Sequence, residues 1–108
     1  MNKINNYNRF LIESNNDRIQ SCTDGILYFL KDNNINDWND FVNMSQFKRD
    51  VINKMIDKGV KDMRELGEVR FNLRLELFNK EQLREYLKEL ESNEEYEKCA
   101  KVLKKISK

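Results

Sequence analysis

Hydrophobic residues recur at helical spacing along most of this 108-residue chain. Near the start they fall at i, i+3, i+6 and i+7, which predicts a short amphipathic helix that ends in the polar residues 14–17. A second apolar set predicts another helix over about residues 19–30, with Gly25 as its weak point. A strand over residues 26–30 is the alternative. The first set comprises Ile4, Tyr7, Phe10 and Leu11.

Asn- and Asp-rich residues 32–37 are typical of a loop. Asp37 and Ser45 are each placed to cap a following helix through a side-chain oxygen. Gly59 lies where a C′ glycine would end the second of these helices. One continuous helix over residues 37–58 is the alternative if the intervening break is not real.

The pattern changes to strict alternation at residues 69–77. Alternation over nine residues predicts a β-strand with one apolar face and one polar face. In a helix the same apolar residues would fall on two separated arcs, which favours the strand. A lone strand needs a partner, which could be residues 26–30, a second copy of the chain or a different protein. The apolar positions are Val69, Phe71, Leu73, Leu75 and Leu77.

Residues 80–107 are predicted to form a C-terminal helical hairpin. Asn79 followed by Gln82 resembles a capping box, and Ser92 or Asn93 is able to cap the second helix. One apolar stripe runs along each helix, and the small residues Cys99 and Ala100 would let the two helices approach closely. The stripes comprise Leu83, Leu87 and Leu90 in the first helix and Tyr96, Cys99, Ala100, Val102 and Ile106 in the second.

This hairpin resembles the UVR motif, which occurs in the UvrB and UvrC excision-repair proteins and in some adaptors of bacterial protease systems. The resemblance covers residues 83–106 and includes Glu97 beside the two apolar stripes. It implies a protein-docking hairpin with no chemistry of its own. Two positions depart from the family pattern, since Leu103 stands where the family has Arg and Lys104 where it has Asp. The family's own partner contacts are therefore not carried over.

Composition points to one small folded domain over residues 1–108. The chain is 39% hydrophobic and 36% charged, contains no Pro and only three Gly, and carries a net charge of +1. We therefore expect a mainly α protein, a small single-domain helical fold with one β-strand at about 69–77 and the C-terminal hairpin. Trp38 shares a face with Phe41 and Val42, which favours a core role over a binding anchor.

The residues that carry most catalysis and metal binding are scarce. The chain has no His, and Cys22 and Cys99 lie too far apart in sequence for a metal-ligand motif. We expect two buried thiols in a reducing, cytoplasmic compartment rather than a disulfide. No catalytic, cofactor or metal site is predicted, nor any membrane segment or secretion signal, and we expect a protein that is not an enzyme.

Contact with a partner is the function that these features favour. We predict a non-enzymatic protein-interaction module, a small regulator or inhibitor that docks on a larger protein or on a second copy. The Asn- and Lys-rich composition also fits a phage-encoded protein. The alternative is a nucleic-acid-associated accessory protein with a basic surface. The candidate partner-binding residues are Arg64, Arg70, Arg74, Arg84, Lys101 and Lys105.

Overall fold

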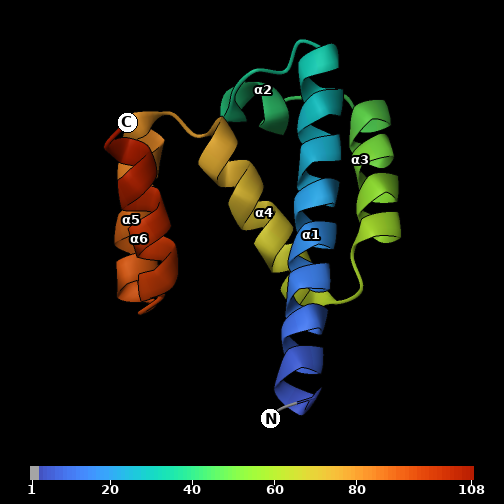
Figure 1. Ribbon diagram of the computed structural model, residues 1–108. Helices are drawn as coiled ribbons and strands as arrows, with labels where there is room; N and C mark the ends of the chain where they lie inside the picture. Colours follow the sequence, from blue (N-terminus) through green and yellow to red (C-terminus); the bar gives the residue numbers. More distant parts are fainter. Residues whose placement is uncertain (1–2) are drawn as a thin grey trace.

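The structure is a computed structural model that describes the backbone of residues 3–108 and the side chains of residues 16–108. Every regular element in this range is an α-helix, which confirms the mainly α prediction. Helix α1 lies between α3 and α4, the α5–α6 pair packs against the C-terminal part of α4, and α2 lies at one end (Figure 1). The elements are α1 Lys3–Asp32, α2 Trp38–Val42, α3 Gln46–Gly59, α4 Met63–Leu77, α5 Lys80–Ser92 and α6 Tyr96–Ile106.

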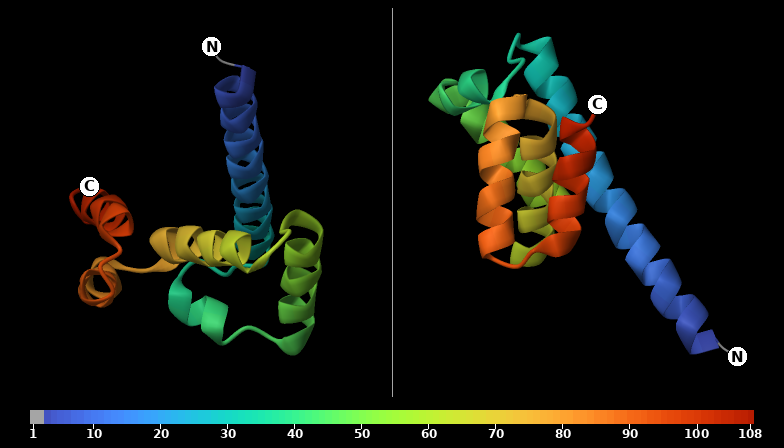
Figure 2. Two further views of the ribbon diagram at one scale, coloured as in Figure 1. Left: turned by 90° about the horizontal axis from the view of Figure 1, so that it is seen from below. Right: turned by 90° about the vertical axis from the view of Figure 1, so that its left-hand side faces the viewer.

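The first helix, α1, is a single element of 30 residues, and its N-terminal half extends beyond the other helices (Figure 2). The predicted break at residues 14–17 is wrong, as is the alternative strand over 26–30. Ser, Asn and Asp are weak helix formers, but each costs only about 0.5 kcal/mol relative to Ala, and neither Pro nor Gly interrupts this stretch. Helical packing of the following turns therefore outweighs the local preference.

Helix α1 ends in a Schellman motif. Asn34 adopts the left-handed conformation with a φ of 62°, and the N–H of Ile35 donates to the carbonyl oxygen of Leu30 at 2.8 Å. Ile35 and Leu30 are both buried in the same hydrophobic cluster, which supplies the apolar contact that accompanies this motif. The predicted loop at 32–37 thus begins with a defined turn.

The two predicted N-caps that follow are confirmed. The Asp37 carboxylate accepts from the N–H of Asp40, and the Ser45 side chain accepts from the N–H of Lys48. Helices α2 and α3 are therefore separate, and the continuous helix over 37–58 is ruled out.

Gly59 ends α3 as predicted, but not through a left-handed C′ conformation, because it is the last helical residue and has no positive φ. A Cβ atom at Gly59 would lie 2.8 Å from Sγ of Cys22 on α1. A glycine at this position lets α1 and α3 approach closely.

The predicted strand at residues 69–77 is wrong, because these residues form the C-terminal part of α4. The two apolar arcs that argued against a helix are both buried, one on each side of it. Val69, Leu73 and Leu77 pack with α1, while Phe71 and Leu75 pack with the hairpin. Two buried faces on a helix can mimic the alternation of a strand.

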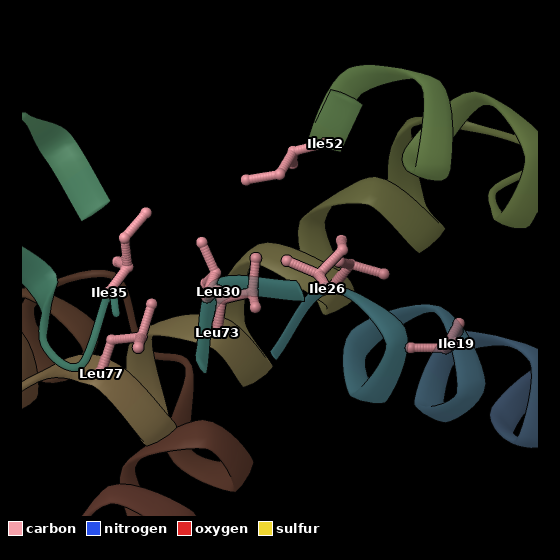
Figure 3. Close-up of a cluster of buried hydrophobic side chains, with 8 residues drawn as sticks. Ile19, Ile26, Leu30, Ile35, Ile52, Leu73 and Leu77 are labelled. Atoms are coloured by element: carbon pink, nitrogen blue, oxygen red, sulfur yellow. The ribbon is translucent and has the colours of Figure 1, made fainter. Parts of the chain in front are cut away.

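Two hydrophobic clusters therefore share α4. The first combines buried residues of α1, α3 and α4 with Ile35 from the loop (Figure 3). The second is built from α4, α5 and α6. Members of the first are Ile19, Ile26, Leu30, Ile35, Ile52, Val69, Leu73 and Leu77, and members of the second are Phe71, Leu83, Tyr86, Leu90, Cys99 and Val102.

The C-terminal pair of helices is present at the predicted place, and Asn79 and Gln82 form the predicted capping box. Some details differ. Tyr96 is 67% exposed and Ala100 is also exposed, so neither lies in the contact between the helices. Neither Ser92 nor Asn93 caps α6: Glu94 takes a left-handed φ of 59°, and Glu95 occupies the N-cap position without a side-chain cap.

Candidate functional site

An open groove of about 380 Å³ lies between α2, α3 and α4. These three helices frame the lower part of the left view in Figure 2. Ile52 and Leu73 are buried lining residues, and the half-buried side chains of Trp38, Phe41 and Ile56 add further apolar surface. A concave, mainly apolar surface of this size is typical of a binding site.

Aromatic packing holds the α2 side of the groove. The rings of Trp38 and Phe41 stack with centroids 5.0 Å apart, and Phe78 meets Trp38 edge-on at 4.8 Å. The guanidinium of Arg49 on α3 donates to the carbonyl oxygen of Val42, the last residue of α2. The short helix α2 therefore contacts both α3 and the C-terminal end of α4 in the absence of a ligand.

Three arginines and no carboxylate are found among the residues that line the groove: Arg49, Arg70 and Arg74. Arg49 and Arg70 are exposed, and neither is paired with a carboxylate among the residues that the structure describes. Unpaired cations beside a low-dielectric wall attract negative charge more strongly than cations on an open surface do.

Arg74 is half-buried, rather than fully exposed as the strand prediction implied. Its guanidinium carbon lies 6.0 Å from the centroid of Trp38 and 5.4 Å from that of Tyr86. One guanidinium nitrogen also donates to the Tyr86 hydroxyl at 3.5 Å. Cation–π contacts on two helices fix the orientation of this side chain and link α2 to the hairpin.

The six predicted partner-binding residues do not form one surface around the groove. Arg70 and Arg74, one helical turn apart on α4, line it together, whereas Arg64, Arg84, Lys101 and Lys105 do not. Lys105 instead pairs with Glu76 at 3.0 Å, and the Lys101 ammonium lies 5.9 Å from the Phe71 ring. Arg64 and Arg84 are exposed on α4 and α5.

Arg49 is the charged groove residue that the sequence analysis missed, and Trp38, predicted as a core residue, is half-buried and also lines the groove. A usable signal was present, because Arg49, Ile52 and Ile56 follow the Ser45 cap at positions i, i+3 and i+7 of one helix. The sequence alone does not show that this face of α3 lies across the groove from Arg70.

A buried ion pair links α1 to α4 at a different place. Glu65 is 1% exposed, bonds to Arg18 through one carboxylate oxygen, and accepts from the N–H of Lys61 at 2.6 Å through the other. The backbone N–H of Lys61 lowers the pKa of Glu65, burial opposes this shift, and Arg18 adds to the lowering. A carboxylate held charged in this way is a structural link between helices.

Both cysteines are free thiols, one in each hydrophobic cluster. Burial raises the pKa of Cys22 and also that of Cys99, where Glu91 adds to the effect. A raised pKa disfavours the thiolate, which is the reactive form. Within the residues that the structure describes, no cluster of His, Cys, Asp or Glu is arranged to hold a metal ion.

No helix in the described part of the chain combines the length and apolar character needed to cross a membrane. Comparisons with protein-family models, with curated proteins and with solved structures find no match to this chain. The resemblance of the hairpin to the UVR motif therefore stays a prediction.

Proposed function

We propose that this protein is a small non-enzymatic interaction module, acting in the cytoplasm as a regulator or inhibitor that docks on a larger protein. The observation that carries the proposal is the groove between α2, α3 and α4, where an apolar floor lies beside arginines without carboxylate partners. Apolar side chains in a concave site supply affinity, and arginine is enriched at the centres of protein interfaces.

A protein partner fits this surface better than nucleic acid does. Lys98 is paired with Glu95 at 3.3 Å and Lys105 with Glu76 at 3.0 Å, so part of the C-terminal basic charge is already neutralised. The net charge of the chain is only +1. Nucleic-acid binding draws mainly on a continuous basic surface, and an apolar floor adds little to it.

The hairpin is a second surface for the same function. Tyr96 and Leu103 are large apolar residues that stay exposed on α6, and Ala100 between them is exposed as well. Spaced at i, i+4 and i+7, they form one outward stripe on the helix. The role that the UVR resemblance implies, protein docking, would use such a stripe.

The direct test is site-specific photo-crosslinking in cells that make the protein natively. A benzoylphenylalanine in place of Asn53 would stand exposed at the groove, and one in place of Lys88 on α5 would serve as the matched control. We expect a discrete protein adduct from position 53 and none from position 88. Adducts to nucleic acid alone, or adducts independent of position, would contradict the proposal, and a salt series with random DNA and RNA would check the alternative.

A further inference from the structure

Resting on this proposed function, we infer that the groove accepts an acidic amphipathic segment of the partner protein. In this arrangement, apolar side chains of the segment fill the floor between Ile52 and Leu73, and its carboxylates meet Arg49 and Arg70. The juxtaposition that carries the inference is an apolar floor with basic residues from two helices.

The charge in the lining of the groove has one sign, and the nearest carboxylates, Glu89 and Glu95, border a separate hollow on the hairpin side of Arg70 and Arg74. Acidic residues of α3 and α4 are not among the residues that line it. On α3, the Asp50 carboxylate accepts from the Gln46 side chain at 2.8 Å. On α4, Glu65 is buried against α1, and Glu76 pairs with Lys105. An approaching carboxylate therefore meets cations without a competing anion in the lining, which is the complementarity that selects partners.

The arginines suit carboxylates in particular. A guanidinium presents two parallel N–H donors to the two oxygens of a carboxylate, and this geometry adds specificity to the charge. Because Trp38 and Tyr86 already orient Arg74, less side-chain freedom is lost when a ligand binds. The segment would thus meet one oriented guanidinium and two exposed ones.

The shape of the groove fits side chains of a segment rather than an enclosed small molecule. It is an open depression of about 380 Å³, and Val42 at its edge is 41% exposed. Recognition of an amphipathic helix works by placing a few apolar anchors in such a groove while polar residues stay at the rim. A segment of two to four turns, about 10–20 Å long, would present the anchors.

The test uses two synthetic helical peptides without Trp. One carries Leu and Phe on one face with Glu and Asp beside them, and the other replaces every acidic residue with Lys. Trp38 is the only tryptophan of the chain and lines the groove, so its fluorescence reports binding. We expect the unmodified protein to bind the acidic peptide at least about tenfold more tightly than the basic one.

Arg70→Glu should remove or invert this preference, while Arg84→Glu, an exposed charge reversal on α5, should leave it unchanged. Circular dichroism checks that both variants fold. If Arg70→Glu does not fold, Arg70→Gln is tested in its place. The salt dependence of peptide binding to the unmodified protein is then measured as well, and the preference for the acidic peptide is expected to shrink as the salt concentration rises. Equal binding of both peptides, no binding of either, or a preference that Arg84→Glu alone abolishes would overturn the inference.

The same protein and peptide samples also test two other possible occupants of the groove. Displacement of the acidic peptide by dodecanoate at stoichiometric concentration would assign the groove to a small amphiphile. A dimer in analytical ultracentrifugation that both Arg70→Glu and Tyr96→Ser dissolve would assign it to a second copy, whose residues 94–97 carry Glu94, Glu95 and Glu97 around an exposed Tyr96. Either result overturns the inference. A crosslinked partner that contacts position 53 through a basic or uncharged segment would overturn it while leaving the proposed function standing.

Discussion

The two sides of α4 differ in how their cores are built. On the α1 side, aliphatic residues come from segments as distant in sequence as Ile19 and Leu77, and a buried ion pair lies alongside. On the hairpin side, the cluster includes two aromatic rings, Phe71 and Tyr86, and all its residues fall within 71–102. The first side depends on long-range assembly and the second on a local fold-back, so the second should form more readily and be easier to anticipate from sequence.

Because one helix serves both clusters, neighbouring substitutions in α4 can separate them. Phe71 is 1% exposed on the hairpin side, and Leu73 is 3% exposed on the α1 side. Phe71→Ala should lower the free energy of unfolding by about 3–5 kcal/mol and Leu73→Ala by about 2–5 kcal/mol. Urea denaturation would measure both losses.

Amide hydrogen exchange would then show which helices each substitution destabilises. We expect Phe71→Ala to speed exchange mainly in α5 and α6, and Leu73→Ala to speed it mainly in α1 and α3. The same exchange pattern in both variants would mean that the two clusters unfold as one cooperative unit and that the comparison does not hold.

The buried ion pair gives the α1 side a pH dependence in the acid range. Because the folded state lowers the pKa of Glu65 below its ordinary value of about 4.3, the pair contributes its stability above that value. The contribution is lost as the pH falls through the folded-state pKa. Glu65→Gln should cost about 1–3 kcal/mol at pH 7 and flatten the loss of stability below about pH 5.

Denaturation across pH 3–7 would check this, with Glu68→Gln at a half-exposed site of α4 as the matched control. An unchanged slope in the Glu65 variant would show that the carboxylate does not stabilise the fold through its charge.

Two glycines test how tightly the α1 side is packed. A Cβ at Gly59 would lie 2.8 Å from the Cys22 sulfur, whereas a Cβ at Gly67 on α4 would meet nothing within 4 Å. Gly59→Ala should destabilise the protein by about 1–2 kcal/mol through overpacking. Gly67→Ala should stabilise it by about 0.5–1 kcal/mol, because Ala is the better helix former. Thermal melts of the pair measure the sign directly, and stabilisation by both changes would mean that α1 and α3 can separate at little cost.

The success of the sequence predictions depended on whether a feature was set by local residues or by distant ones. Local signals gave correct answers at Asp37, Ser45 and the Asn79–Gln82 capping box, since each cap involves residues only three positions apart. The strand at 69–77 was wrong because its alternation reflects burial on both sides of α4, and that burial depends on segments far away in the chain.

The candidate site was anticipated only in part. Arg70 and Arg74 could be selected from sequence, but Arg49 could not be joined to them, because α3 and α4 meet only through the tertiary fold. Arg74 was also expected to be exposed, and its contacts with Trp38 and Tyr86 bring together three separate helices. The periodicity of a sequence shows which faces of a helix are buried, but it does not show which other helix meets each face.

The smallest effect is expected at Tyr96, where the hairpin side departs most from its own sequence pattern. Helical spacing places Tyr96 with the apolar stripe of α6, yet its side chain is 67% exposed, while Tyr86 on α5 is buried and meets the rings of Phe71 and Phe78. Tyr96→Ser should therefore change the free energy of unfolding by less than about 0.5 kcal/mol, as surface substitutions usually do. Tyr86→Ala should cost about 3 kcal/mol, the low end of the range for a buried aromatic. Chemical denaturation of both variants decides the matter. A loss above about 1 kcal/mol at Tyr96 would mean that this tyrosine helps to hold the turn between α5 and α6. In that case the exposed ring of Tyr96 would serve the fold, and the proposal of α6 as a docking stripe would rest on Ala100 and Leu103.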